Sequence, residues 1–270
     1  MRLECDPEVA RAISEYGPRE TYRRFCEQLD REIRSPVLDN GRHLAARRTV
    51  LHTTLVAHWL AAQQQEFGYD RPFALVAIGG TGRGEMTPCS DTDFALLFEE
   101  STEHNPFLDR LLAQTIHGKQ FVESYGFPIW PQPYNLEHLP ALAGIQLNAF
   151  LDMSAVYDPH DLARQFRERI RATFDPFEHF LHVSSSWRGV CCSRAEAACE
   201  RLDQFDIKKE GLRAFLAGVW TLGGPPFCHS WEVYAGLDDQ RDLEAYYFLL
   251  RIRACIHLRR GTHLPAKMDG

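Results

Sequence analysis

The chain has 270 residues and a mass of 31.0 kDa, enough for one large domain or two modest ones. It is 44% hydrophobic and 25% charged, and its formal net charge of −7 argues against a broad electrostatic grip on nucleic acid. No apolar run reaches the roughly 20 residues of a membrane helix, and the N-terminus lacks the apolar core of a signal peptide. We therefore expect a cytoplasmic protein that binds neither nucleic acid nor a membrane, and whose partner is a small nucleotide or a protein.

The N-terminal part of the chain is predicted to be helical. Apolar residues recur at helical spacing over Glu20–Ile33 and again over Arg47–Gln65. Arg42, Arg47 and Arg48 could reach a bound phosphate, but a solvated helix face is the simpler interpretation of these three cations.

A strand, a glycine-rich loop and a second strand are predicted next. The apolar run Phe73–Ile78 breaks at Gly79–Gly80, a polar loop follows, and Phe94–Phe98 is apolar again. Aromatic and β-branched residues bounded by glycine and proline favour strands, so the chain is expected to cross the same sheet twice here.

Two aspartates stand just before the second strand. Alternate residues of a strand share a face, so Asp91 and Asp93 are expected side by side, with Ser90 next to them. Neighbouring carboxylates repel each other unless a cation neutralises them, and Mg²⁺ combines one or two carboxylates with phosphate oxygens. Gly79 and Gly80 let backbone N–H groups approach an anion. The pattern indicates a nucleotide triphosphate site, and a surface hairpin with two solvated aspartates is the alternative.

Other glycine motifs are excluded by their spacing. A dinucleotide fingerprint would need a third glycine where Glu85 stands, and a P-loop would need a lysine after Gly84. Arg83 instead adds a charged side chain one residue beyond Gly82.

This stretch resembles the nucleotidyltransferase domain of the DNA polymerase β superfamily. Gly-Gly-x-Gly-Arg-x-Glu followed by Ser-Asp-x-Asp is similar to the bacterial PII-protein uridylyltransferases, which are also uridylyl-removing enzymes. The resemblance implies that the catalytic residues, which hold Mg²⁺ or Mn²⁺, are Asp91 and Asp93. The residues that it implies for nucleotide binding are Gly79, Gly80, Arg83 and Ser90.

Two later segments extend the resemblance. Asp206–Arg213 is similar to the Lys-rich segment that precedes Gly-Gly-Leu-Arg-Asp in the uridylyltransferases, with one glycine lost and Ala214 in place of the acid. Phe248–Arg253, followed by His257–Leu258, resembles the Phe-Leu-x-Arg-x-Arg helix of the family.

The predicted fold class is α+β, with a small mixed sheet in a nucleotidyltransferase core, flanking helices and a following all-helical domain. We predict an N-terminal helical segment over residues 1–66, the core over 67–140 and the helical domain over 141–270. Within this scheme Phe107–Tyr125 is a helix, and Phe127–Tyr134 is a strand whose prolines indicate a sheet edge. Residues 145–170 are expected to be helical, and Leu243–Arg260 forms the last helix.

The sequence departs from the family in two respects. Full uridylyltransferases continue into an HD-type hydrolase domain and two ligand-sensing domains, so we expect uridylyl removal and glutamine sensing to be missing from this chain. The superfamily also uses a third carboxylate on a later strand, whereas Phe127–Gln132 contains no acid and Pro128 stands about where the acid is expected. Glu123 and Glu137 are near in sequence but lie at predicted helix ends.

The expected function is Mg²⁺-dependent transfer of a nucleotidyl group from an NTP to a PII-like signalling protein. UTP and the PII-like acceptor rest on the resemblance alone, because no motif reports base recognition. The alternative is a catalytically weakened transferase fold that acts as a nucleotide-binding or regulatory module.

Overall fold

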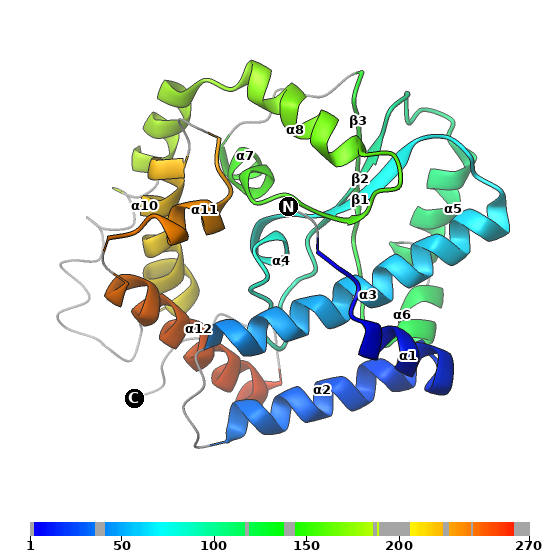
Figure 1. Cartoon of the computed structure of the whole chain (residues 1–270), viewed down its shortest axis with the longest axis horizontal. Coiled ribbons are helices and arrows are strands. Elements are labelled where there is room, and N and C mark those ends of the chain that lie inside the picture. Colours follow the sequence, from blue (N-terminus) through cyan, green and yellow to red (C-terminus); the bar gives the residue numbers. More distant parts are fainter. Residues whose placement is uncertain are drawn as a thin grey trace.

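A computed structural model describes residues 3–35, 41–116, 119–137, 144–185, 188, 206–223, 227–238 and 240–261. Its centre is a four-stranded mixed sheet with the strand order β3-β2-β1-β4, and helices surround it (Figure 1). The strands are β1 Phe73–Ala77, β2 Phe94–Phe98, β3 Gln132–Asn135 and β4 Ser154–Tyr157. The predicted α+β class is confirmed.

The two central strands are buried along their whole length. β1 pairs antiparallel with β2 and with β4, while β2 pairs parallel with β3. Every residue of β1 and β2 is buried, because helices cover both faces of the sheet. β3 lies at one edge, where a proline costs no ladder hydrogen bond, so the predicted edge position is confirmed.

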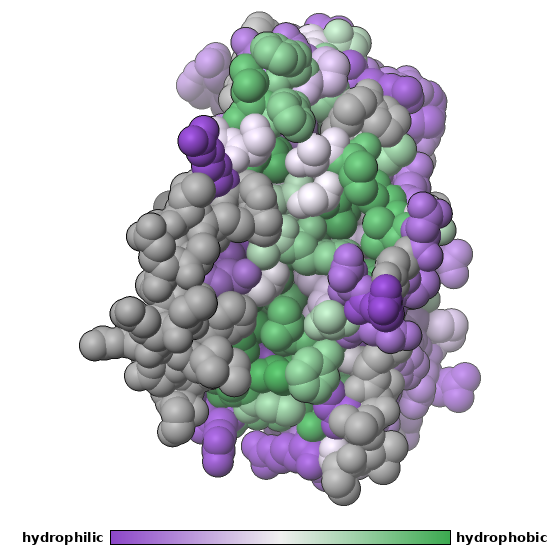
Figure 2. Space-filling view, turned by 90° about the vertical axis from the view of Figure 1, so that its left-hand side faces the viewer, coloured by the Kyte–Doolittle hydropathy of each residue, from purple (hydrophilic) through white to green (hydrophobic). Residues whose placement is uncertain are grey.

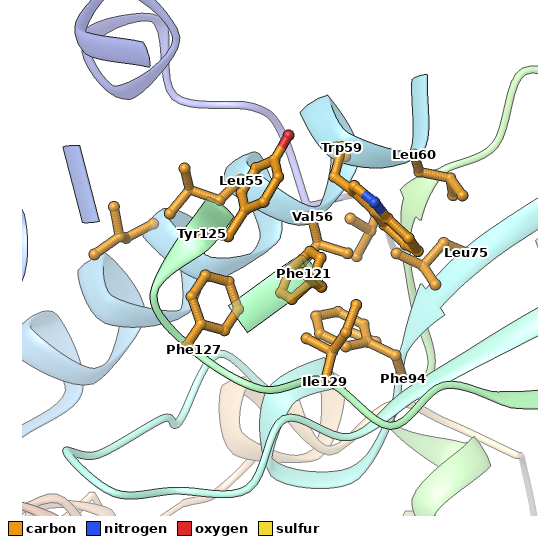
Figure 3. Close-up of a cluster of buried hydrophobic side chains, with 14 of the residues drawn as sticks. Leu55, Val56, Trp59, Leu60, Leu75, Phe94, Phe121, Tyr125, Phe127 and Ile129 are labelled. Atoms are coloured by element: carbon orange, nitrogen blue, oxygen red, sulfur yellow. The ribbon is translucent and has the colours of Figure 1, made fainter. Parts of the chain in front are cut away.

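One face of the sheet shares a hydrophobic core with the N-terminal helices. Phe73, Leu75, Phe94 and Leu96 point to this side, and the aromatic residues around them are drawn in Figure 3. The helices on or beside this face are α1 Pro7–Tyr16, α2 Pro18–Arg34, α3 Gly41–Phe67, α5 Pro106–Thr115 and α6 Gln120–Tyr125. The first of them begins where the side chain of Asp6 accepts hydrogen bonds from two backbone N–H groups of its first turn.

The opposite face packs against two helices, α7 Gly144–Leu151 and α8 Leu162–Thr173. The intervening strand residues Ala74, Val76, Ala95 and Leu97 point to this side. Strand side chains alternate, so residues two positions before Ala95 point to the same face. This rule places the aspartates before β2 on the α7 side.

The C-terminal elements form a third hydrophobic cluster beside the sheet. They are η2 Ile207–Leu212, α10 Arg213–Gly223, α11 Ser230–Ala235 and α12 Arg241–Arg260. η2 is a single turn of π-helix, a form that is frequent at functional sites. α12 lies against α3 and α2 (Figure 1). At the contact a Cβ on Gly41 would stand 2.4 Å from the carbonyl oxygen of Tyr247, so only glycine fits there.

Figure 2 turns the left-hand side of Figure 1 toward the viewer. Figure 2 shows hydrophobic residues down the middle of this face, with hydrophilic residues along its right-hand border. The large apolar side chains that are exposed in the C-terminal half of the described chain are Phe177, Phe180, Leu181, Leu222 and Phe248.

Some sequence-based elements were wrong in detail. The single helix predicted over Phe107–Tyr125 is two helices, α5 and α6, and the predicted strand Phe127–Tyr134 is reduced to β3. The stretch 145–170, which was expected to be helical, contains β4 between α7 and α8. The sequence did not reveal this strand, because Ser154–Tyr157 is too short to interrupt the helical pattern on either side of it. Arg48 is not on a solvated face: it is buried and forms an ion pair with Asp30.

The boundaries at residues 66 and 140 remain predictions. Over the described ranges of the chain, no helix has the length and apolar character needed to cross a membrane.

Candidate functional site

The glycine loop forms one turn of helix, α4 Gly79–Gly82, directly after β1. Gly79 has a φ of +55°, a conformation that side chains disfavour. A Cβ on Gly82 would stand 1.9 Å from the carbonyl oxygen of Asp152, in the segment that enters β4. The turn therefore needs its first glycine for backbone conformation and Gly82 for a close backbone approach.

Asp91 and Asp93 lie in the loop that leads into β2. The backbone of Asp93 is fixed on both sides, because its N–H donates to Thr81 Oγ1 at 3.1 Å and its carbonyl accepts from the N–H of Ile78 at 3.0 Å. A Cβ on Gly79 would stand 3.7 Å from Asp93 Oδ2. The glycine turn and the second aspartate are therefore neighbours in space.

The electrostatic state of Asp93 depends on its surroundings. Asp93 is an exposed residue, but the protein around its carboxylate displaces enough water to raise the pKa of that group. The negative charge of Asp91 raises this pKa further. Lys208 and Arg83 act in the opposite direction. The aspartate pair is thus held under mutual repulsion, which a bound cation would relieve.

All six predicted site residues line one cavity of about 210 Å³. Its remaining walls come from α7, η2, α10 and α12. The other lining residues include Asn148, Ala149, Lys208, Leu212, Arg213, Leu216, Trp220, Tyr246, Leu250 and Arg253. The cavity therefore lies between the sheet and the C-terminal helices.

Ser90 is anchored to α12. Its hydroxyl oxygen accepts from the N–H of Thr87 at 2.9 Å and is 2.8 Å from Thr87 Oγ1. Thr87 Oγ1 is in turn 3.1 Å from Nδ1 of the buried His257 on α12. The predicted nucleotide-binding serine is thus positioned, through Thr87, by a histidine that is more than 160 residues away in sequence.

Arg83 is buried between two carboxylates. Its Nε donates to Glu85 Oε2 at 2.6 Å and its Nη1 to Asp152 Oδ2 at 2.7 Å. Its Nη2 is the nitrogen nearest to Gly80, 3.7 Å from where a Cβ would stand. Arg83 therefore organises the loop with two of its nitrogens and lines the cavity as well.

The two carboxylates extend this network into the C-terminal helices. Glu85 accepts from the hydroxyls of Tyr234 and Tyr246, at 3.1 and 2.6 Å. Asp152 Oδ1 accepts from the backbone N–H of Ser230 at 2.9 Å. Hydrogen bonds and an arginine replace the water that these buried carboxylates lose. The glycine loop and the helical wall are thereby joined by one buried polar network (defined here as Arg83, Glu85, Asp152, Tyr234 and Tyr246).

Three cations face the aspartates from the helical side: Lys208 on η2, Arg213 at the start of α10 and Arg253 on α12. Burial lowers the pKa of Lys208 and of Arg253. The sequence contained a signal for them, because all three belong to the two later family-like segments, but it assigned them no role. Asp152, Asn148 and Trp220 were missed, since no pattern marked them.

No third carboxylate joins the pair within the described ranges, where no group of three potential metal ligands occurs. Gln132 pairs with Ala95 and so shares the face of Asp93. Ile129 is 1% exposed and points into the aromatic core on the other face (Figure 3). Gln132 is the first residue of β3 on this face, while Pro128, where the sequence places the expected acid, lies beside the aspartates: its carbonyl accepts from Thr92 Oγ1 at 2.9 Å.

The donor set fits a hard divalent cation. Two carboxylates that repel each other open into a cavity with room for phosphate oxygens and water, which complete the octahedral shell that Mg²⁺ prefers. The beginning of α4 opposite Asp93 carries no side chain that would obstruct this space.

The sheet, the glycine turn and the paired aspartates agree with the nucleotidyltransferase core that the sequence predicts, and so does a comparison of sequences. Residues 39–132 match the family model described as "Putative nucleotidyltransferase DUF294". The matched stretch contains the glycine turn and both aspartates, so the predicted resemblance is confirmed for this part of the chain.

Particular relatives can also be named. The chain is similar to the bifunctional uridylyltransferase/uridylyl-removing enzyme of Chromobacterium violaceum, with 43% identity over 51 residues, which are 19% of this chain and 6% of the relative. The enzyme of the same name from Pseudomonas aeruginosa is 35% identical over 83 residues, 31% of this chain and 9% of the relative. That from Burkholderia orbicola is 33% identical over 85 residues, 31% and 10% of the two chains. The matches thus span a tenth or less of these curated relatives.

Proposed function

We propose that this chain transfers a nucleotidyl group from a Mg²⁺-bound NTP, with UTP as the donor, to a hydroxyl group of a PII-like protein. The observation that carries the proposal is the meeting of the glycine turn with Asp91 and Asp93 in one cavity. UTP is inferred from the relatives' name, uridylyltransferase, the PII-like acceptor from the resemblance of the sequence motifs, and the metal from the chemistry of the two carboxylates.

Different residues would bind the metal and the phosphates. Asp91 and Asp93 would hold the metal, while Gly79, Gly80 and Ser90 would orient the phosphates at the end of β1. The chemistry that a bound Mg²⁺ supplies is stabilisation of the negative charge on the transferring phosphates.

The bond changes follow from this arrangement. The acceptor oxygen forms a bond to the α-phosphorus, the bond from that phosphorus to the bridging oxygen breaks, and pyrophosphate leaves with the electron pair. The proton of the acceptor hydroxyl passes to water, because no third potential metal ligand joins the aspartates within the described residues and Glu85, the other acid of the cavity, is paired with Arg83. General-base help is worth about 10² to 10⁴ in rate. We therefore expect slow turnover.

One observation favours a second function. Gln132, the first residue of β3, lies on the face of the sheet that Asp93 shares, and an amide cannot act as the general base there. A chain that binds Mg·NTP without transferring it would act as a nucleotide-dependent regulatory module. The exposed hydrophobic residues of Figure 2 suit a protein partner in either case.

A transfer assay separates these functions. The chain is incubated with each α-labelled NTP, Mg²⁺ and a purified PII protein, and the label on the acceptor is followed. We expect slow, UTP-dependent labelling that an Asp91→Asn, Asp93→Asn double variant loses. Tight NTP binding with no labelling of the acceptor would support the regulatory module, and no NTP binding at all would contradict both functions.

A further inference from the structure

Asn148 on α7 places a side-chain amide in the wall of the cavity. The residue is 5% exposed, and its Oδ1 lies 2.6 Å from Nε2 of the buried His179. An amide oxygen only accepts hydrogen bonds, so His179 donates from Nε2. The amide nitrogen, Nδ2, donates to no other residue in the described ranges. The fully buried polar atoms without a partner belong to other residues of these ranges, so Nδ2 keeps open space beside it, and the space beside Asn148 is the cavity.

His179 is itself held firmly in place. It lies near the start of the helical stretch 176–185, where Oδ1 of Asp175 caps the helix by accepting from two backbone N–H groups, at 2.8 and 3.1 Å. The imidazole packs against the ring of Phe174, with 5.3 Å between the ring centroids. Burial lowers the pKa of His179 and the nearby His182 lowers it further, so the imidazole is neutral near pH 7. The donor of the hydrogen bond is thus fixed in position and in tautomer.

The hydrogen bond decides which way the amide points. Burying an imidazole and an amide costs free energy unless their polar groups are hydrogen-bonded, and this pair forms a single bond between its side chains. With Oδ1 turned toward His179, Nδ2 must lie on the other side of the amide plane's axis and face away from the imidazole. A ligand site fixes the orientation of its ligand with a few polar groups placed in this way.

The amide stands next to the glycine turn. The Cβ of Ala149, the following residue of α7, lies 3.9 Å from the place that a Cβ on Gly79 would take, and Asp93 Oδ2 lies 3.7 Å from the same place. All of these residues and Asn148 line the same cavity of about 210 Å³. A space of this size is small for a nucleotide, so a bound nucleotide contacts every wall, α7 included.

We propose that Nδ2 of Asn148 donates a hydrogen bond to an oxygen atom of the bound nucleotide, and that His179 is the positioning residue that aims this donor. His179 does not touch the ligand. It acts by preventing the amide from turning its own oxygen into the cavity, where that oxygen would face the oxygen of the ligand. The proposal rests on the proposed function for the identity of the ligand, but it concerns the binding of the nucleotide and not its transfer.

Binding of Mg·UTP to the full chain, measured by calorimetry, tests the donor. Asn148→Leu removes the amide without adding charge and should weaken UTP binding about threefold to tenfold, which is the value of one neutral hydrogen bond. Gln146→Leu is the matched control, because Gln146 is an exposed amide on the same helix and lies outside the cavity. Tripolyphosphate then locates the acceptor oxygen. If Asn148→Leu binds it as the wild type does, the oxygen belongs to the base or the ribose, and equal weakening assigns it to the phosphates.

A double-mutant cycle tests the positioning role of His179. His179→Phe keeps a ring but removes the donor, so the amide can turn either way and UTP binding should weaken about threefold. In the Asn148→Leu background the same change should leave UTP affinity unaltered, because no amide remains to be oriented. His179→Gln retains an N–H donor and should bind UTP as the wild type does. His182→Phe, at an exposed position of the same helix, is the control for the substitution.

The affinity of folded protein decides the outcome, because loss of the buried hydrogen bond lowers the melting temperature in any case. If Asn148→Leu does not fold, Asn148→Asp replaces it, since it keeps the acceptor for His179 and removes the donor, with Gln146→Glu as its control. Wild-type UTP affinity in folded Asn148 variants would overturn the proposal, as would equal weakening in the controls or an effect of His179→Phe that persists without the amide. A wild type that binds no nucleotide would overturn this proposal and the proposed function together. A wild type that binds UTP without transferring it would contradict the proposed function alone.

Discussion

The two walls of the cavity hold their charges in opposite ways. On the sheet wall, Arg83 is enclosed by Glu85 and Asp152 and its charge is balanced inside the protein. On the helical wall, Arg253 has a buried nitrogen without a partner in the described chain. The first arrangement holds a loop in shape, while the second leaves a charged side chain beside the cavity with a nitrogen unsatisfied in the described chain. The arginine of the glycine motif is thus a structural residue that joins the loop to the segment before β4.

The largest effect is expected on the sheet wall at the aspartates. Asp91→Asn with Asp93→Asn should reduce transfer roughly a thousandfold or more, because charge stabilisation by a bound metal is worth several kcal/mol. Nucleotide binding should lose its dependence on Mg²⁺. The melting temperature should stay the same or rise slightly, since the pair repels itself. A large fall in melting temperature would mean that the aspartates are structural.

Gly82→Ala tests the shape of the same wall. The added Cβ would meet the backbone of Asp152 at 1.9 Å, and neither chain can move aside cheaply. We expect a loss of about 3 kcal/mol in the free energy of unfolding, measured by urea denaturation. Gly218→Ala on α10 is the control, because its Cβ would meet nothing within 4 Å and alanine favours a helix. Similar stability changes in the two variants would contradict the close approach.

Gly80→Val separates phosphate binding from folding. The structure has room for a Cβ there, since the nearest atom, Arg83 Nη2, is at 3.7 Å, so the fold should tolerate the change. A branched side chain would instead occupy the space of the phosphates and weaken NTP binding roughly thirtyfold, with Gly80→Ala in between. Near-normal affinity of a folded Gly80→Val protein would show that the phosphates lie elsewhere.

The Gln132→Glu variant tests whether a general base is the one group that the site lacks for fast transfer. A carboxylate at this edge position shares the face of Asp93 and should raise turnover about tenfold or more with little change in NTP affinity. Pro133→Glu, one residue on and facing the other side, is the control. Fast transfer by the unmodified chain would sink this idea and point to an acid from another part of the protein.

The smallest effect concerns pH. Burial and Asp91 raise the pKa of Asp93 in the folded state, so ionising it costs stability. That cost is absent below the ordinary aspartate pKa and is complete above the raised one. Asp93→Asn should therefore be more stable than the wild type near pH 7, by about 1 kcal/mol or less. The difference, measured by urea denaturation, should shrink as the pH falls toward 4. If the stability difference between Asp93→Asn and the wild type does not change with pH, the extra stability of the variant comes from packing and not from the lost charge.

The sequence and the structure agree best where neighbouring residues carry the signal. Gly79, Gly80, Asp91 and Asp93 are close in sequence, and strand alternation with glycine chemistry was enough to predict that they meet. The two central strands were predicted for the same reason, as short apolar runs between turns.

Long-range contacts explain what the sequence did not reveal. The partner of Arg83 is Asp152, 69 residues away, and nothing local marks that aspartate. β4 was missed because four residues cannot show a period of two against helical neighbours. The register of β3, which puts Gln132 on the face of the sheet that Asp93 shares, depends on its pairing with β2.

The close approach at Gly82 affects how sequences that contain this glycine motif should be interpreted. The carbonyl oxygen of Asp152 forbids any side chain at this position, whether or not the protein handles nucleotides. A descendant that had lost its chemistry would still have to keep this glycine in order to fold. This glycine is therefore evidence of the fold and not of activity, and a search for chains that can bind a metal in this cavity should score the two aspartates.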